Sequence, residues 1–499
     1  MNAPVQLLPR RKASQDEPHR IDVEAVNAKG ARALYKKRQQ IYPKLVQGRF
    51  RTIKWAAMIV LLAIYYVTPW IRWERAGAAP DQAVLVDFEG RRFYFFILEL
   101  WPQEIYYITG LLILASVGLF LATALVGRVW CGYACPQTVW TDLFIYVERF
   151  FEGDRNARIR LDKAPLSLSK LARKSAKHIV WLLIALVTGG AWVFYFADAP
   201  TLFADIFTGR ADPTVYLFIG LFTFTTYTLA GTMREQVCTY MCPWPRIQAA
   251  MTDQDALSVT YRTDRGEPRG PHKKGESWEG RGDCIDCNQC VAACPQGIDI
   301  RDGDQLECIN CALCIDACDA IMEKIGRPRG LIAYDTHANV ARRARGEKAG
   351  WRFVRPRTLL YAVVFALVGA LMLGALMTRQ TVSLDVVRDR NPPFVRLADG
   401  SIRNNYLLKI INMDPHARSV DISVEGVAGA HLSMFGRDGE SDTLNVEARA
   451  DSVTTVRVHV TAPAGAAEGP SRVTFDLRDA ATEASLAESQ AAFVGSEQR

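Results

Sequence analysis

Residues 284–318 read CIDCNQCVAACPQGIDIRDGDQLECINCALCIDAC. This stretch contains two successive runs with the spacing C-x2-C-x2-C-x3-C, and Pro295 follows the first run. In proteins with two cubane clusters, the first three cysteines of each run bind one cluster and the fourth binds the other. The spacing therefore predicts a ferredoxin-like α+β domain that carries two [4Fe–4S] clusters.

The crossed pattern assigns each of these eight cysteines to one cluster. Cluster A takes Cys284, Cys287, Cys290 and Cys318. Cluster B takes Cys308, Cys311, Cys314 and Cys294. Zinc also binds paired cysteines, but it usually requires two separated C-x2-C pairs, so the spacing favours iron–sulfur chemistry. Asp319 stands where proline usually follows the second run, and this change removes no ligand.

The other four cysteines form a repeated C-x-Y-x-C-P motif. They are Cys131, Cys135, Cys238 and Cys242. Thiols at positions i and i+4 would share one helix face, and the following proline would end the helix. Four converging thiolates can hold Cu(I) or a further iron–sulfur centre, and Met233 and Met241 would be additional thioether ligands. The duplication argues against the alternative of small packing residues in membrane helices.

Five apolar stretches predict membrane-spanning helices. They lie at about residues 55–73, 105–126, 178–196, 213–231 and 359–377. Lys and Arg are frequent before the first stretch and between the second and third, whereas Arg210 is the only basic residue between the third and fourth. Because basic residues favour the inner side, the N-terminus and the cluster domain are predicted to be cytoplasmic.

The C-terminal segment has the alternation typical of β-strands. VTTVRVHV (453–460) places Val456, Val458 and Val460 on one face, and SRVTFDL (471–477) alternates in the same way. NYLLKIIN (405–412) and SVDISV (419–424) are further predicted strands. About seven short strands in this segment predict an immunoglobulin-like β-sandwich.

These signals predict a multi-domain, multi-pass protein of the bacterial inner membrane. Its predicted parts are a cytoplasmic N-terminal segment (1–54, disordered over 1–30), four transmembrane helices (55–244), the cluster domain (245–357), a fifth helix (358–379) and a periplasmic immunoglobulin-like domain (380–499). The net charge of +7 is concentrated beside the apolar stretches, which indicates a lipid-bilayer partner and not nucleic acid. The sequence contains no C-x2-C-H haem motif and no P-loop.

The motifs together resemble the FixG/RdxA/CcoG family of cytochrome c oxidase accessory proteins. Besides the double cysteine run, the resemblance rests on CGYACPQTVWTDLFIYVERFFEGDR (131–155), CTYMCPWPRIQAAM (238–251), GLIAYDT (330–336) and NPPFVRLADGSIRNNY (391–406). The combination is much more specific than any single motif. Asp319 and Ala333 depart from the family pattern, which has proline and a basic residue there.

The resemblance implies a role in the maturation of cbb3-type cytochrome c oxidase, through reduction of Cu(II) to Cu(I). It implies that the four cysteines of the repeated motif belong to the copper or redox site. It also implies a cytoplasmic electron donor, which the sequence does not identify, and oxidase subunits or copper-delivery proteins as partners. Two alternatives remain open at this stage: a quinone-linked electron relay, and a non-enzymatic assembly scaffold whose clusters sense redox state.

Overall fold

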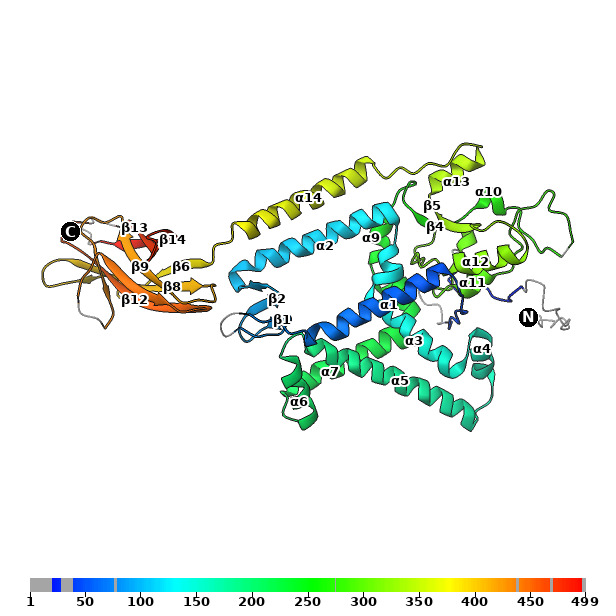
Figure 1. Cartoon of the computed structure of the whole chain (residues 1–499), viewed down its shortest axis with the longest axis horizontal. Helices are drawn as coiled ribbons and strands as arrows, with labels where there is room; N and C mark the ends of the chain where they lie inside the picture. Colours follow the sequence, from blue (N-terminus) through cyan, green and yellow to red (C-terminus); the bar gives the residue numbers. More distant parts are fainter. Residues whose placement is uncertain are drawn as a thin grey trace, which may run out of the picture. The chain divides into compact units, whose positions relative to one another are not determined.

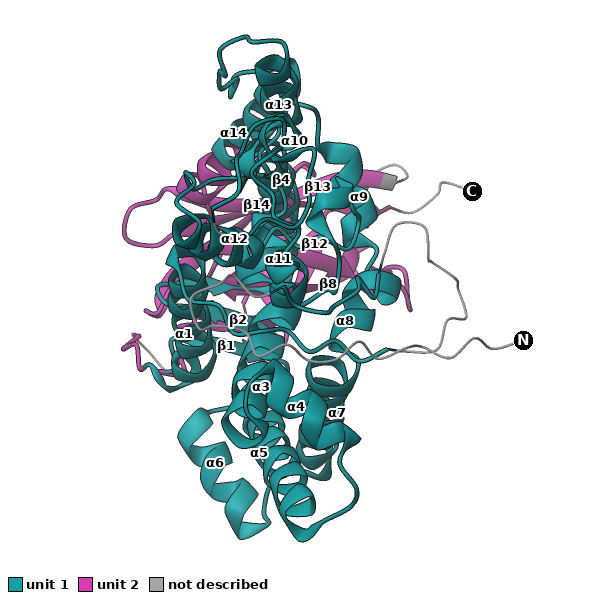
Figure 2. Cartoon of the chain, turned by 90° about the vertical axis from the view of Figure 1, so that its right-hand side faces the viewer, with its two compact units in different colours: residues 1–71, 82–370 teal, residues 72–81, 371–499 magenta. Residues whose placement is uncertain are grey.

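The computed structural model describes residues 20–27, 39–75, 79–273, 275–436, 439–466 and 470–495. The chain divides into two compact units (Figure 2). Unit 1 comprises residues 1–71 and 82–370, and unit 2 comprises residues 72–81 and 371–499. Unit 1 contains all twelve cysteines, and unit 2 contains the segment predicted to form a β-sandwich.

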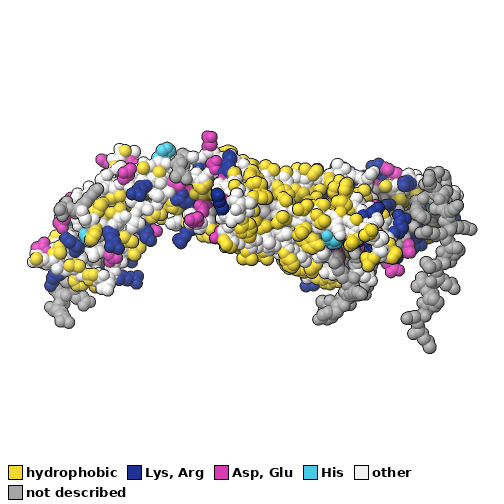
Figure 3. Space-filling model, turned by 90° about the horizontal axis from the view of Figure 1, so that it is seen from below, with side chains coloured by type: hydrophobic (Ala, Val, Ile, Leu, Met, Phe, Trp, Pro, Cys, Tyr) yellow, Lys and Arg dark blue, Asp and Glu magenta, His cyan; other side chains and the backbone are white. Residues whose placement is uncertain are grey.

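Five helices among the described residues are long and apolar enough to cross a membrane. They cover Arg49–Trp70, Pro102–Val126, Leu168–Val193, Pro213–Thr232 and Pro356–Met377. Their α-helical parts are α1 (Arg49–Val67), α2 (Ile105–Val126), α5 (Leu168–Val193), α7 (Pro213–Thr226) and α14 (Pro356–Met377) (Figure 1). Leu112 and Leu217 are more than half exposed, and Figure 3 shows hydrophobic side chains in a broad band over this part of the surface. Such a surface fits lipid contact, and the five predicted spans are confirmed as helices.

Two of these helices begin earlier than the sequence predicted. The first starts at Arg49 and not near residue 55, because Arg51 and Lys54 are buried against Asp142 and need not lie in water. The third starts at Leu168 and not near residue 178. The Ser167 side chain caps this helix by accepting a hydrogen bond from the backbone N–H of Lys170. An apolar stretch of sequence indicates only the part of a helix that contacts lipid. The charged first turns of these two helices were therefore not included in the predicted spans.

Shorter strands and helices connect these long helices or follow them within unit 1. A three-stranded antiparallel sheet that was not predicted lies between α1 and α2, with strands β1 (Val84–Asp87), β2 (Arg92–Phe95) and β3 (Leu98–Leu100). The further helices are α3 (Pro136–Glu152), α4 (Arg155–Lys163), α6 (Ala199–Thr208), α8 (Arg234–Gln236) and α9 (Trp244–Met251). α3 packs against α5 and leads directly away from the first repeated motif.

The cluster domain combines a two-stranded sheet with short helices, as an α+β fold predicts. Its elements are β4 (Ser258–Tyr261), α10 (Thr263–Gly266), α11 (Gln289–Ala293), α12 (Leu313–Lys324), β5 (Ile332–Asp335) and α13 (His337–Ala344). β4 and β5 pair antiparallel, and Val259, Ile315, Met322 and Ile332 form part of its core. α12 also contacts α1, so the domain lies at the start of the first long helix (Figure 1).

The N-terminal segment is partly ordered against this domain. The backbone of Ile21 donates to the carbonyl of Cys287 at 3.0 Å, and that of Lys44 donates to Ala292 at 2.8 Å. The disorder predicted for residues 1–30 is therefore wrong for residues 20–27, whose backbone finds partners in the cluster loops. Residues 1–19 and 28–30 lie outside the described residues.

Unit 2 contains two packed antiparallel sheets, in agreement with the predicted sandwich. One sheet has the order β10-β12-β8-β6, with β7 also on β8, and the other has the order β11-β9-β13-β14. The strands are β6 (Val382–Arg388), β7 (Val395–Arg396), β8 (Ile402–Asn412), β9 (Arg418–Glu425), β10 (His431–Met434), β11 (Thr443–Ala448), β12 (Ser452–Ala462), β13 (Pro470–Asp479) and β14 (Ser485–Val494). The structure thus has more strands than the seven predicted, because short strands such as β7 carry no alternation.

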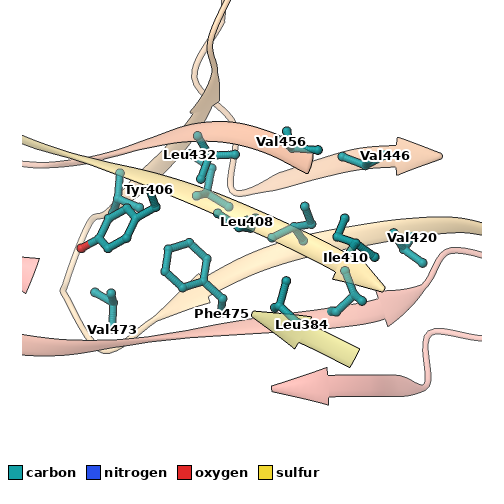
Figure 4. Close-up of a cluster of buried hydrophobic side chains, with 14 of the residues drawn as sticks. Leu384, Tyr406, Leu408, Ile410, Val420, Leu432, Val446, Val456, Val473 and Phe475 are labelled. Atoms are coloured by element: carbon teal, nitrogen blue, oxygen red, sulfur yellow. The ribbon is translucent and has the colours of Figure 1, made fainter. Parts of the chain in front are cut away.

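The core of the sandwich follows the predicted alternation. Val456, Val458 and Val460 are all buried, as expected for one face of β12. Tyr406 and Phe475 come from opposite sheets and meet inside the core, with ring centroids 5.1 Å apart (Figure 4). Aromatic contacts of this kind contribute beyond the area that they bury.

We expect Phe475→Ala in the full-length protein to destabilise unit 2 by roughly 3–5 kcal/mol, because it removes a fully buried ring from a packed core. The measurement is hydrogen exchange and proteolysis of residues 382–494. Phe435→Ala is the matched control, since Phe435 is 67% exposed. Equal protection in both variants would contradict this account of the core.

Candidate functional site

The two cysteine runs share an unusual backbone conformation. Asp286 and Asn288 in the first run have φ angles of 53° and 56°, and Asn310 and Ala312 in the second have 52° and 61°. These residues occupy the same two places in each run, and positive φ is uncommon for residues other than glycine. Such strain persists only where the surroundings require it, so the repetition indicates loops built to curl around a bound group.

The thiols gather in the two predicted sets. Burial raises the pKa of Cys318 well above its usual value, and the neighbouring thiols of Cys290, Cys287 and Cys284 raise it further. Cys318 thus lies beside the first run, although it belongs to the second.

The fourth cysteine of the first run crosses in the opposite direction. Burial raises the pKa of Cys294 to about 12, and Cys311 and Cys308 of the second run raise it further. Cys294, Cys308, Cys311 and Cys314 also line one cavity. The structure therefore brings together the residues assigned to cluster A and those assigned to cluster B.

The number and the spacing of these eight cysteines fit two clusters better than single ions. Among the described residues, the cysteines of the repeated motifs included, no three His, Cys, Asp or Glu side chains lie close enough to hold one metal ion, so a single ion at any of them would require its ligands to move closer together. A zinc site draws four ligands onto one ion, whereas each cysteine of a cubane cluster binds a different iron around a wider core. The donor set and its cavity therefore fit [4Fe–4S] clusters.

Arg301 is a residue of this site that the sequence analysis missed. Its guanidinium donates to Asp286 Oδ1 at 2.7 Å and to Asn288 Oδ1 at 2.8 Å, and it also pairs with Asp299. These contacts hold both strained residues of the first loop. No motif marks Arg301, and its contacts appear only when the loop is folded.

The repeated C-x-Y-x-C-P motifs lie on short turns of their own. α2 ends at Val126, where Gly127 adopts a φ of 67°, so the first motif is not the last turn of the span as predicted. Cys131 and Cys238 each sit in a π-helical turn, Trp130–Ala134 and Val237–Met241. The proline after the first motif begins α3. Proline is favoured at the first position of a helix, so Pro136 can start α3. The membrane span therefore does not have to continue through the motif.

The two turns are alike in their hydrogen bonding. The backbone of Cys135 donates to the carbonyl of Trp130 at 2.8 Å, and that of Cys242 donates to the carbonyl of Val237 at 2.8 Å. Both bonds span five residues, which widens the turn relative to an α-helix. Single π-turns of this kind occur frequently at functional sites.

The four motif thiols form one group, called here the four-thiol group. Burial raises the pKa of Cys131 to about 12, with a further contribution from Cys135. Burial also raises the pKa of Cys238 to about 12, with contributions from Cys135, Cys131 and Cys242. The thiols of Cys131 and Cys238 are therefore protonated at neutral pH, and a bound metal ion would displace their protons. Met241 is 56% exposed, which does not fit a ligand of this half-buried group, and Met233 stays a prediction.

The four-thiol group lies against the loop of cluster B. A Cβ atom on Gly132 would approach the carbonyl oxygen of Ile309 to 2.8 Å. Tyr133 Oη donates to the carbonyl of Cys311 at 3.2 Å. Cys131 and Cys238 both pack on the small hydrophobic cluster that contains Ile309 and Cys311. The turns that carry the four-thiol group and the loop of cluster B, which are separated in the sequence, are thus in direct contact.

Buried charges surround the second motif, and the sequence analysis did not identify them. Arg51 Nη1 lies 2.9 Å and Lys54 Nζ 3.9 Å from Asp142 Oδ1. Burial opposes ionisation of Asp142, but Lys54 and Arg51 outweigh it and hold the pKa of this carboxyl below its usual range. Glu148 likewise accepts from Arg158 at 2.5 Å and from Arg234 at 2.8 Å.

Three family descriptions match separate parts of the chain. Residues 108–154 match a 4Fe-4S binding domain, and residues 233–337 match a 4Fe-4S dicluster domain. Residues 372–496 match the Ig-like fold at the C-terminus of FixG. The first two matches include all twelve cysteines.

Curated relatives match along most of the chain. The nitrogen fixation protein FixG of Rhizobium meliloti is 52% identical over 478 residues, which cover 89% of this chain and 91% of the relative. Protein RdxB of Cereibacter sphaeroides is 52% identical over 87% of this chain and 91% of its own length. Protein RdxA of the same organism is 50% identical over 89% and 94%. With its two cysteine runs, paired motifs and C-terminal sandwich, the chain belongs to the FixG family.

Proposed function

We propose that this protein is a membrane-bound cupric reductase that acts in the assembly of cbb3-type cytochrome c oxidase. The observation that carries the proposal is the contact between the four-thiol group and the loop of cluster B. When bound, [4Fe–4S] clusters supply one-electron transfer. Reduction of the substrate Cu(II) to Cu(I) takes one electron per ion, and this electron comes from a cytoplasmic donor.

The residues of the four-thiol group would act on copper in two ways. Thiolates are soft ligands that favour Cu(I), so their binding energy stabilises the product over Cu(II). The Cys131 thiol also donates to Gln248 Oε1 at 3.1 Å, which fixes its direction before an ion arrives. Gly132 leaves room for the close approach of this turn to the cluster loop.

The proposed location is the inner membrane of a bacterium, with the clusters in the cytoplasm and the sandwich in the periplasm. The distribution of Lys and Arg along the sequence supports this orientation. Copper-delivery proteins and oxidase subunits are the proposed partners. Unit 2, with its own buried core, is the part of the chain that would reach partners in the periplasm.

A second candidate function is a quinone-linked electron relay. A cavity of about 250 Å³ lies beside Cys308 of cluster B, and its walls include Arg128, Ser258, Asp304 and His337. These side chains offer hydrogen bonds to a polar ring. Oxidation of the pre-reduced protein by a quinone, without any by Cu(II), would favour this function.

The double variant Cys131→Ser/Cys238→Ser is expected to abolish copper reduction while both clusters remain. Serine is a poor ligand for Cu(I), and neither residue belongs to a cysteine run. The measurement uses anaerobic protein that has been chemically reduced and freed of excess reductant. Cu(I) captured by a chelator is then compared with the visible absorbance of the clusters. Cys308→Ser is the contrasting variant, which should lose cluster absorbance. Copper reduction that persists in the double variant would exclude the four-thiol group as its site.

Gly132→Ala is expected to slow copper reduction by roughly tenfold or more, because the new Cβ pushes the motif away from the cluster loop. A misplacement of reacting groups by about 1 Å can lower a reaction rate by up to about 100-fold. Cluster content should not change. The control is Gly190→Ala, since a Cβ there meets no atom within 4 Å. Equal rates in the two variants would show that the close approach is unimportant for the reaction.

Iron content tests whether the four-thiol group is free for copper. We expect about eight iron atoms per chain, because each [4Fe–4S] cluster contains four. Residues 108–154 match a 4Fe-4S binding domain, and the cysteines in that range are Cys131 and Cys135. This match favours a further cluster at the four-thiol group. About twelve atoms per chain, falling to about eight in the double serine variant, would establish that further cluster and refute the copper site.

A further inference from the structure

Lys54 is a buried cation at the edge of the four-thiol group. Its side chain is on α1 and the residue is only 4% exposed. Its neighbour Arg51 donates to Asp142 Oδ1 at 2.9 Å, while Lys54 Nζ lies 3.9 Å from the same oxygen. Two cations thus share one carboxylate, which leaves a surplus positive charge at this place.

This charge faces a cavity that also reaches a motif cysteine. Lys54, Asp142, Thr138 and Cys238 are among the residues that line it. Arg234 is the other cation in the described lining, and Glu148 pairs with it at 2.8 Å. Of these two cations, Lys54 is the one whose carboxylate contact is long, at 3.9 Å, and is shared with Arg51. Its charge also acts on the Cys238 thiol, where it opposes the effect of burial.

A buried ammonium requires a physical reason. Removing such a group from water costs several kcal/mol, and one carboxylate shared with an arginine compensates only in part. Ionisable residues inside membrane proteins therefore often mark functional sites. A purely structural Lys54 would be expected to approach Asp142 as closely as Arg51 does.

The first motif has a comparable cation. The Arg128 charge opposes the effect of burial on the Cys131 thiol, as Lys54 does for Cys238. Arg128 also donates to the carbonyls of Leu306, Cys308 and Pro245, so it has a structural role. Lys54 is the better test of charge alone, because it makes fewer backbone contacts.

We propose that Lys54 is a positioning residue whose charge makes the four-thiol group select monovalent over divalent metal ions. A fixed positive charge repels a bound ion in proportion to the charge of that ion, so Cu(II) is disfavoured about twice as strongly as Cu(I). Lys54 exchanges no proton and no electron in this role. It stabilises the product of the one-electron reduction relative to the substrate. The inference rests on the proposed function only in requiring that the four thiols bind a metal ion.

The test compares Lys54→Met with Lys54→Arg in full-length protein with intact clusters. Each protein receives one equivalent of Cu(I) or of Cd(II), a soft divalent ion without redox chemistry, under anaerobic conditions against a competing chelator. We expect Lys54→Met to raise the affinity for Cd(II) on the order of tenfold more than the affinity for Cu(I). Lys54→Arg keeps the charge and should keep the ratio of the native protein. Lys348→Met is the control for loss of an exposed lysine.

The outcomes separate this inference from the proposed reductase activity. An unchanged ratio in Lys54→Met, or the same rise in Lys54→Arg, would overturn the role of Lys54. A shifted ratio in a protein that does not reduce Cu(II) would refute the reductase and support the selection by charge. Failure of both ions to bind the native four-thiol group would overturn both proposals.

A second variant keeps the test decisive if Lys54→Met loses its clusters. Asp142→Asn removes the carboxylate and leaves both cations, so it should lower the affinity for Cd(II) relative to Cu(I) by a similar factor. A rise in relative Cd(II) affinity in this variant would refute the electrostatic mechanism.

Discussion

The site depends on the close approach of two backbones, the turn of the first C-x-Y-x-C-P motif and the loop between Cys308 and Cys311. Gly132 permits this approach because a side chain there would meet the Ile309 carbonyl. Tyr133 and Arg128 then donate to carbonyls of the same loop at 3.2 Å. Buried carbonyls need such partners, so the cluster loop cannot leave the motif without losing them. The distance between the two groups of cysteines is fixed in this way by hydrogen bonds.

Buried ion pairs fix the helix that leaves the motif. α3 begins at Pro136, directly after Cys135, and its Asp142 and Glu148 bind cations from α1, α4 and α8. A buried charge is stable only with its partners in place, and loss of one partner is strongly destabilising. The direction of α3, and with it the position of Cys135, therefore depends on contacts made about two to three and a half turns further along the helix.

Local signals in the sequence account for the parts that could be predicted. Cysteine spacing specified both cluster sets, and alternation in residues 453–460 specified the inner face of β12. Long-range pairs explain what could not be predicted. Lys54 and Asp142 are far apart in the sequence, and so are Ile21 and Cys287. The start of α1 and the ordered part of the N-terminal segment therefore cannot be predicted from the sequence, because both depend on contacts that form only in the folded protein. A single sequence contains no periodic signal for such contacts.

The four-thiol group satisfies two requirements that oppose each other. Contact with the cluster loop demands burial, and burial raises the pKa values of Cys131 and Cys238. Metal binding demands thiolates, whose charges repel one another in a partly buried place. Cations beside the first cysteine of each motif reduce this conflict without becoming ligands. Under the proposed function these cations would also repel a bound metal ion, so the four-thiol group would hold soft Cu(I) better than Cu(II).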